Sequence, residues 1–149
     1  MHFSCPCTTA NLATLLILGV LGNTVQAETH SIKCPLKVSA DSIQVAKPPT
    51  GWTPFVATEF WLHSAGPMDG PPADLAVLMG EEPTKRSDRK AVTKWNLSGV
   101  FSGAKWIACN YGQGNEVILS QRINDTTKEC IVTSSEHEFG RVSIEITCS

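Results

Sequence analysis

The residues best placed for nucleophilic chemistry lie in one short stretch, where His63 is followed directly by Ser64, with Asp69 nearby. A catalytic triad needs a histidine beside a serine or cysteine and an acid that orients the imidazole. Neighbouring residues of a strand point to opposite faces of the sheet, so His63 and Ser64 are not expected to meet. His137 is expected to lie at a turn. The histidines therefore predict no nucleophilic site, and we assign no catalytic residue.

Acid–base cleavage of a glycosidic bond would need a pair of carboxylates held on either side of that bond. Four candidates are scattered over the expected strands and loops, namely Glu59, Asp69, Glu116 and Glu145. Nothing in their spacing brings two of them together. An enzyme is therefore the less favoured class, and a protein that acts by binding is the more favoured one.

The number and spacing of the cysteines distinguish metal binding from disulfide formation. Cys5 and Cys7 fall in the leader described below. The four cysteines of the mature chain are Cys34, Cys109, Cys130 and Cys148. Structural zinc sites usually use close pairs of ligands, roughly two to four residues apart, and these four are far apart. An even number in an exported chain instead predicts two disulfides, with three ways to pair them, and no metal or other cofactor.

The first 27 residues are typical of a signal peptide. Residues 12–21 form an apolar run of ten, which is too short to span a bilayer. The segment Val25-Gln26-Ala27 then places small residues where a signal peptidase reads. We expect cleavage after Ala27, which leaves one β-rich domain of residues 28–149 in the periplasm or outside the cell. The alternative is an uncleaved amino-terminal anchor, and no later segment is expected to cross a membrane.

Charge gives little indication of a polymeric partner. The chain has 12 basic and 14 acidic residues, and its formal net charge is −2. Proteins that bind nucleic acids usually carry a basic excess, so nucleic acid is not an expected partner. Residues 85–90 form a basic run, which would be a docking patch for a phosphate-bearing envelope polymer or an acidic protein. A solvated loop balanced by Glu81 and Glu82 is the favoured interpretation.

Alternating apolar and polar residues predict a series of short strands. Residues 142–148 are the clearest case, with Val142, Ile144, Ile146 and Cys148 on one face. Similar alternation marks residues 32–38, 58–63 and 93–97, and residues 129–133 are expected to form a further strand. About eight such strands predict an all-β, mainly antiparallel fold, a small disulfide-stapled sandwich or barrel. Residues 64–74 hold two Gly and three Pro and are expected to be loop.

Residues 105–130 are expected to form the hairpin at the centre of this fold. With residues 112–115 as a four-residue loop, Cys109 would face Ile118, and a loop of another length would shift the register. Both faces of the hairpin carry apolar residues, so we expect it to be covered on both sides.

The strand positions of the cysteines favour one pairing of the three. Cys34 lies on the inward face of the first strand and Cys148 on that of the last, whereas Cys109 and Cys130 flank the hairpin unit. We therefore favour Cys34–Cys148 with Cys109–Cys130. Each bond would stabilise the fold by roughly 2–4 kcal/mol, chiefly by restricting the unfolded chain.

Several motifs together resemble a known family. They are Ile32-Lys33-Cys34-Pro35 after a signal peptide, Pro49-x-Gly51-Trp52, Trp95-x-Leu97, Trp106-x-x-Cys109-x-Tyr111, and the strands of Cys130 and Cys148. In this order they resemble a family of small, uncharacterised exported proteins of Gram-negative bacteria. The resemblance implies a periplasmic location and the disulfides, and it brings no activity with it.

A second, shorter motif is similar to one in periplasmic inhibitors of C-type lysozyme. Ser102-Gly103-Ala104-Lys105-Trp106 fits their Ser-Gly-x-[Arg/Lys]-aromatic pattern, and these inhibitors are small β-barrels that insert a loop into the enzyme cleft. On that analogy Ser102 would hydrogen-bond a catalytic carboxylate, and Gly103, Lys105 and Trp106 would complete the binding segment. The inhibitors' second motif, with its Lys-Gly, is missing from this sequence, and Cys109 has no counterpart in their pattern.

These features predict a periplasmic or secreted binding protein of unknown ligand, with an envelope protein or a glycan as the candidate partners. A lysozyme-inhibitor-like protein and a structural envelope component are the alternatives. The four tryptophans, Trp52, Trp61, Trp95 and Trp106, would either line a sugar or peptide groove or pack in the core. The core is favoured for most of them, because large aromatic side chains dominate burial in small β domains.

Overall fold

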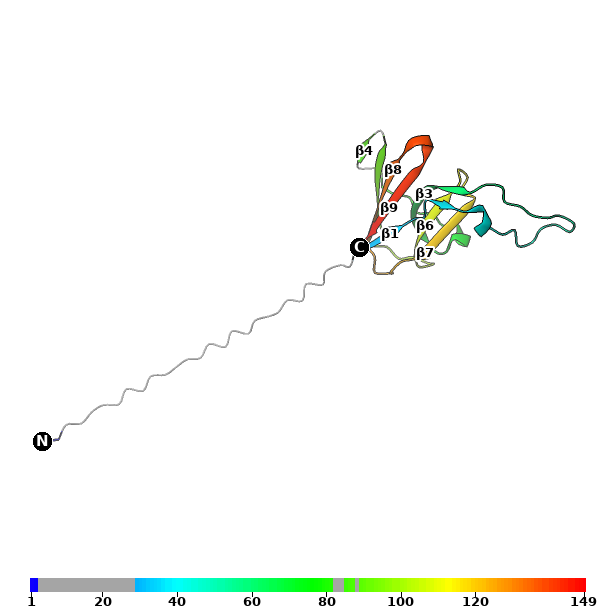
Figure 1. The fold of residues 1–149 in the computed structure, drawn as a ribbon. Coiled ribbons are helices and arrows are strands. Elements are labelled where there is room, and N and C mark those ends of the chain that lie inside the picture. The colour runs from blue at the N-terminus through cyan, green and yellow to red at the C-terminus, as the bar shows by residue number, and fades with distance from the viewer. Residues whose placement is uncertain (3–28, 82–84, 88) are drawn as a thin grey trace.

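The computed structural model describes residues 1–2, 29–81, 85–87 and 89–149 (Figure 1). The expected signal peptide, with its cleavage point after Ala27, lies outside the described residues and stays a prediction. The side chains of residues 82–88 lie outside them as well. The hypothesis that the basic run is a docking patch therefore also stays a prediction.

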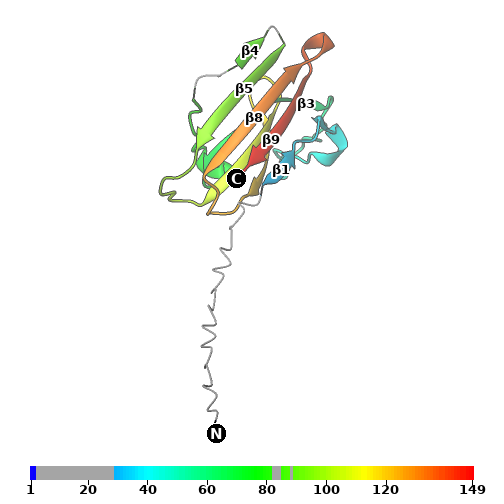
Figure 2. The same cartoon turned by 90° about the vertical axis from the view of Figure 1, so that its left-hand side faces the viewer.

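The described residues form two antiparallel sheets of nine strands in all (Figures 1 and 2). The first sheet has the order β1 (His30–Lys33), β9 (Val142–Cys148), β8 (Glu129–Glu136), β5 (Lys90–Asn96) and β4 (Lys85–Ser87). The second has the order β2 (Lys37–Val38), β3 (Phe60–Asp69), β6 (Lys105–Tyr111) and β7 (Val117–Arg122). Three short 3₁₀ turns complete the described elements: η1 (Ala40–Ser42), η2 (Pro72–Asp74) and η3 (Glu138–Gly140). The predicted all-β, antiparallel class is confirmed, and the architecture is a sandwich.

One core fills the space between the sheets, and the alternation in the sequence positions it. In β9 the side chains of Ile144, Ile146 and Cys148 are buried, while the intervening Glu145 and Thr147 are exposed. Strand β6 is different, because five of its seven residues are buried between its neighbours β3 and β7. The predicted central position therefore holds for β6, whereas β7 is an edge strand.

The register predicted for the β6–β7 hairpin is wrong by one residue. Cys109 lies opposite Leu119 instead of Ile118, because the loop has five residues, from Gly112 to Glu116. Gly112 takes a φ of 79°, which only glycine adopts at little cost. The carboxylate of Glu116 folds back over the loop and accepts a hydrogen bond from the N–H of Gly114 at 3.1 Å. This local bond supports the longer loop, and the strand pattern does not reveal it.

The expectation that residues 64–74 are loop is wrong for residues 64–69, since β3 runs through Asp69, and it holds for residues 70–74, which form a bend and the short turn η2. Pro67 is tolerated there because a residue of an antiparallel strand directs its N and C=O to the same neighbour. Pro67 directs both away from β6, and its carbonyl accepts a hydrogen bond from the N–H of Leu78 at 3.2 Å. Gly66 serves packing, because a Cβ at this position would lie 3.3 Å from the ring of Trp95. Gly66 and Pro67 therefore do not break the strand. The glycine makes room for a ring, the proline accepts a hydrogen bond from outside the sheet, and the backbone stays extended.

Cys34, Cys109, Cys130 and Cys148 all form disulfides, as predicted, but the favoured pairing is wrong. The bonds are Cys34–Cys109 and Cys130–Cys148. Strand β1 does pair with β9, but His30 is the residue opposite Cys148, which places Cys34 further along and out of reach. Cys148 instead faces Cys130 directly across the β8–β9 pair. Cys34 reaches Cys109 on β6, so this bond joins the two sheets.

Candidate partner-binding surface

The segment predicted to bind, from Ser102 to Trp106, begins as a loop that is fastened to the end of β3. The carboxylate of Asp69 accepts three hydrogen bonds from it: from the N–H of Gly103 at 2.8 Å, and from the N–H and hydroxyl of Ser102 at 3.2 and 3.0 Å. These donors favour the ionised carboxylate, so they lower the pKa of Asp69, with the Gly103 N–H having the largest effect. The hydroxyl that the inhibitor analogy directs to an enzyme is donated here to the chain's own Asp69.

The other two residues of that segment are also engaged within the chain. The side chain of Lys105 is buried, and its ammonium donates to the carbonyl of Thr127 at 2.6 Å. The same ammonium lies 4.9 Å from the centre of the Phe101 ring. The indole N–H of Trp106 donates to the carbonyl of Gly103 at 3.2 Å. The structure thus brings all four predicted residues into one internally bonded unit, and its role in binding a partner stays a prediction.

The residues considered for catalysis are kept apart. Ser64 accepts a hydrogen bond from the side-chain amide of Asn110 at 3.0 Å, while Asp69 lies at the far end of β3. His63 lies at a break in the β3–β6 register, between Leu62 and Ser64. Within the described ranges, no group of three or more His, Cys, Asp and Glu side chains is arranged to hold a metal ion. Ser64 and Asp69 therefore do not come together as parts of one catalytic triad.

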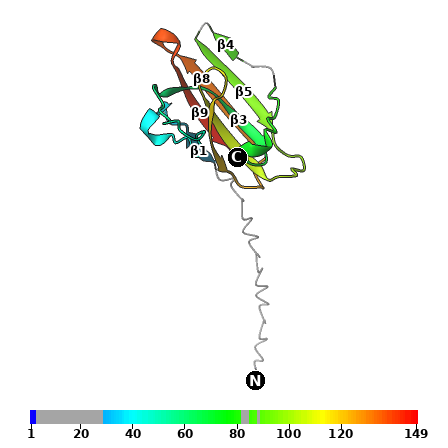
Figure 3. The same ribbon diagram turned by 90° about the vertical axis from the view of Figure 1, so that its right-hand side faces the viewer.

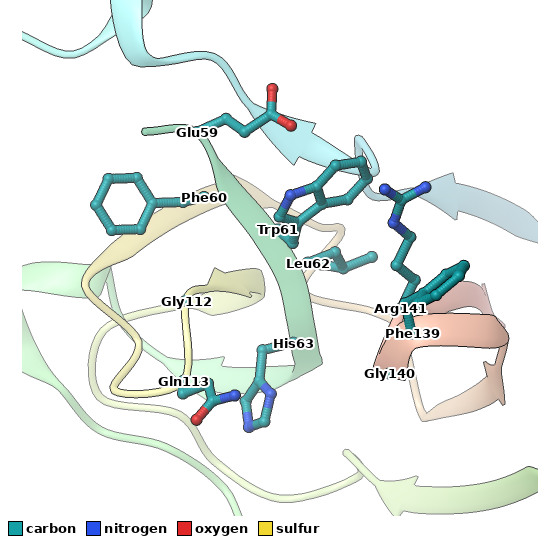
Figure 4. A pocket seen from close by; sticks show the side chains of 10 residues that line it. All are labelled: Glu59, Phe60, Trp61, Leu62, His63, Gly112, Gln113, Phe139, Gly140 and Arg141. Carbon is teal, nitrogen blue, oxygen red and sulfur yellow. The ribbon is translucent and has the colours of Figure 1, made fainter. Parts of the chain in front are cut away.

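A pocket of about 410 Å³ opens where the two sheets meet at the start of β3 (Figure 4). Its walls are residues 59–63 at the start of β3, Gly112 and Gln113 in the β6–β7 loop, and residues 139–141 before β9. The register break at His63 adds an unpaired residue to β3 at this point. Such bulges redirect side chains and end pairing, and they are common beside functional sites. The pocket and the register break thus lie at the same end of β3.

Trp61 forms the centre of this pocket wall, and two cations of the chain lie near its ring. The guanidinium carbon of Arg141 lies 4.2 Å from the centre of the ring, and the ammonium of Lys37 lies 5.4 Å from it. Figure 4 shows the side chain of Arg141 beside Trp61. Lys37 is also ion-paired with Glu59 at 2.5 Å. Strand pairing explains the arrangement, because Lys37 of β2 lies directly opposite Trp61 of β3. The site combines an aromatic face with excess positive charge.

Phe139 stands at the rim of the same pocket with its side chain 92% exposed. Its backbone φ is 61°, a left-handed conformation that is uncommon for a bulky residue. An exposed phenylalanine in a strained turn is costly for folding, and such outliers cluster at binding sites. The sequence indicates only a turn here, because neither exposure nor a positive φ can be read from Phe139-Gly140. For Trp61 the sequence leaves a groove open as an alternative to the core, and the structure places the residue in a pocket wall.

The fold and this surface are those of a small, disulfide-braced binding protein. Residues 57–149, which include β3 to β9, match the family model of the type VI secretion system Tli immunity protein. The match covers more than half of the chain, and the chain belongs to this family. No curated protein and no solved structure matches it. Membership is consistent with the resemblance to exported Gram-negative proteins, and no match supports the similarity to lysozyme inhibitors.

Proposed function

We propose that this protein is an immunity protein of the periplasm, which binds an effector toxin of a type VI secretion system and blocks its action. The observation that carries the proposal is the family match over residues 57–149. An immunity protein acts by binding its toxin, so it needs a recognition surface and no reaction centre. The pocket and its aromatic and cationic rim supply such a surface.

The chemistry of the rim indicates what it would contact. Tryptophan, tyrosine and arginine are the residue types that most often contribute the large binding energies of protein interfaces. Trp61, Arg141 and the exposed Phe139 lie together at one pocket. Lys37 and Arg141 outnumber Glu59 there, so the pocket favours an acidic side chain of the toxin beside an apolar one.

Two features support a location outside the cytosol. Disulfides persist in oxidising compartments such as the periplasm, and the bonds Cys34–Cys109 and Cys130–Cys148 brace both the contact between the sheets and one pair of neighbouring strands. The expected leader of residues 1–27 would deliver the chain there. Within the described part of the chain, no helix has the length and hydropathy needed to cross a bilayer.

A competition experiment between bacterial strains tests the proposal. The prey is the encoding bacterium with this gene deleted and its own type VI secretion system inactivated, so that prey cells cannot attack one another. The attacker is the parent strain with that system either active or inactivated. We expect the prey to be killed only by the active attacker, and to be rescued by the full-length chain. A version that begins at residue 28, and so stays in the cytosol, should not rescue it.

Equal survival of the deletion strain against both attackers would overturn the immunity function. A deletion strain that is weakened without any attacker would instead support the alternative of a structural envelope component. The experiment therefore separates the two binding classes even while the toxin is unidentified.

A further inference from the structure

The segment between η1 and β3 projects from the sandwich as a long arm, which we define as residues 43–58. Figure 1 shows it extending away from both sheets, and Figure 3 views the molecule from the side on which it projects. The chain reverses at its tip, where the N–H of Trp52 donates to the carbonyl of Pro49 at 3.1 Å. Gly51 has a φ of 82° at the third position of this turn, which a type II β-turn requires. The arm is thus an out-and-back excursion with a defined tip.

The arm presents large apolar side chains to solvent. Trp52 is 74% exposed and Phe55 is 87% exposed, and Val45 is exposed on the opposite leg. This corrects the expectation that most tryptophans are core, as far as Trp52 is concerned. Lys47 is the one charged residue among residues 43–58. A soluble domain gains nothing in stability from exposed aromatic rings, and rings gathered on a projection indicate a binding partner.

The backbone N–H and C=O groups of the arm, like its exposed side chains, can contact a binding partner. Among residues 44–58, all of which the structure describes, the turn bond from Trp52 to Pro49 is the one hydrogen bond between backbone groups. A hollow of about 290 Å³ separates the two legs and is lined by residues 43–45 and 54–56. Pro48, Pro49 and Pro54 stiffen the arm by fixing φ, which lowers the entropy lost when it is bound. The arm is a preformed, extended peptide with free donors and acceptors.

We propose that the arm inserts Trp52 and Phe55 into an apolar cleft of the effector toxin and so determines which toxin is bound. The inference rests on the proposed immunity function and identifies the element that gives it specificity. The occupant is a folded protein, because a protein cleft can bind both aromatic rings and pair with the unbonded backbone groups. A bilayer offers those backbone groups no partners, and one lysine gives little attraction to anionic lipid.

The position of the arm supports a role in selecting the toxin. The family match begins at residue 57, so residues 43–56 lie outside the matched part of the chain. The arm also returns to the sandwich at Glu59, which lines the pocket described above. A toxin bound at the Trp61 pocket would therefore meet the root of the arm, and the arm would extend the contact beyond the shared sandwich.

The test compares two double variants of the full-length chain in the competition experiment. The first carries Trp52→Ala and Phe55→Ala, and the control carries Leu75→Ala and Met79→Ala, which are exposed apolar residues on a different segment. Truncation of one central aromatic side chain commonly weakens an interface by about 30-fold. We expect the arm variant to leave at least about tenfold fewer surviving prey than the wild-type chain, and the control to protect like wild type. Both variants should keep the wild-type thermal unfolding midpoint, because the four side chains are exposed.

A crosslinking experiment adds a direct readout of contact. A photoreactive phenylalanine analogue at position 55 should give a crosslinked product during attack by the active strain and none with the inactivated one. The same analogue at position 75 should give no product that depends on the attacker.

Each other outcome counts against the proposal in a distinguishable way. Full protection by the arm variant, or equal loss from both variants, would overturn the role of the arm while leaving the immunity function intact. Failure of the wild-type chain to protect would overturn the immunity function itself. The remaining outcome is that the wild-type protein binds phosphatidylglycerol vesicles or forms a dimer on size-exclusion chromatography. If the arm variant abolished either property, the arm would bind a membrane or a second copy of the chain, and the proposed toxin cleft would be wrong.

Discussion

The guanidinium carbon of Arg141 lies 4.2 Å from the centre of the Trp61 ring, and this contact joins the two sheets at the pocket. Trp61 belongs to β3 of the second sheet, and Arg141 directly precedes β9 of the first. The same indole lies within 5.4 Å of the ammonium of Lys37. Two cationic side chains thus lie near one aromatic ring at the pocket of the proposed toxin-binding surface.

Replacing Arg141 with alanine should reduce binding far more than stability. An exposed cation–π contact contributes about 0.5–1 kcal/mol, so we expect the free energy of unfolding to fall by no more than that, as measured by urea denaturation. Protection in the competition experiment should fall at least about tenfold if Arg141 is a central contact. Arg141→Lys keeps the charge and loses the planar stack, so it should give an intermediate result. Wild-type protection by Arg141→Ala would exclude this pocket from the interface.

The two disulfides should differ in what they contribute. Cys34–Cys109 closes a sequence separation of 75 residues and Cys130–Cys148 one of 18. On the chain-entropy model these loops correspond to about 4.5 and about 3 kcal/mol. We therefore expect the double variant Cys34→Ser with Cys109→Ser to lose more unfolding free energy than Cys130→Ser with Cys148→Ser.

Peptide mapping of the non-reduced protein checks the pairing itself. Proteolytic fragments should be joined as Cys34 with Cys109 and Cys130 with Cys148, and mass spectrometry identifies them. A fragment that joins Cys34 to Cys148 would contradict the register between β1 and β9.

The alternation of apolar and polar residues predicts the structural features that follow from burying one face of a strand. In β9 the alternation from Val142 to Cys148 specifies both the strand and its inward residues, because a half-buried strand has a period of two. The presence of two disulfides can likewise be predicted from the number of cysteines, because this prediction does not require knowing which strands pair.

The same alternation does not predict features that are set by contacts between residues far apart in the sequence. The disulfide pairing requires the register of β1 on β9, which is set by side-chain packing across the sheet. Pro67 resembles a loop signal because its hydrogen-bond partner, Leu78, cannot be identified from the sequence. The exposure of Phe139 and Trp52 could not be predicted either, because an aromatic residue in a short β domain is ordinarily expected to be buried.

The lowered pKa of Asp69 predicts a pH-dependent contribution to stability. A carboxyl whose pKa is lower in the folded protein stabilises the fold above its unfolded pKa, and this contribution is lost as the pH falls through the folded pKa. We therefore expect Asp69→Asn to unfold at lower urea concentration than wild type near neutral pH. The difference should shrink as the pH falls below the ordinary value of 3.8. Glu145→Gln, which removes an exposed carboxylate from β9, is the control. A difference between Asp69→Asn and wild type that did not change with pH would contradict the prediction.

A side chain at position 66 should be crowded, because a Cβ there would lie 3.3 Å from Cζ2 of Trp95 and the ring would have to shift. The indole is not free to retreat, since its N–H donates to the carbonyl of Leu78 at 3.1 Å. Overpacking of this kind costs about 1–3 kcal/mol, so Gly66→Ala should lower the free energy of unfolding by that amount. Gly99→Ala is the matched control, because no described atom lies within 4 Å of its Cβ. We expect that control to leave stability unchanged or to raise it by up to about 1 kcal/mol through the unfolded chain. Equal urea midpoints for the two variants would show that Trp95 does move, and that the contact between β3 and β5 is looser than the structure indicates.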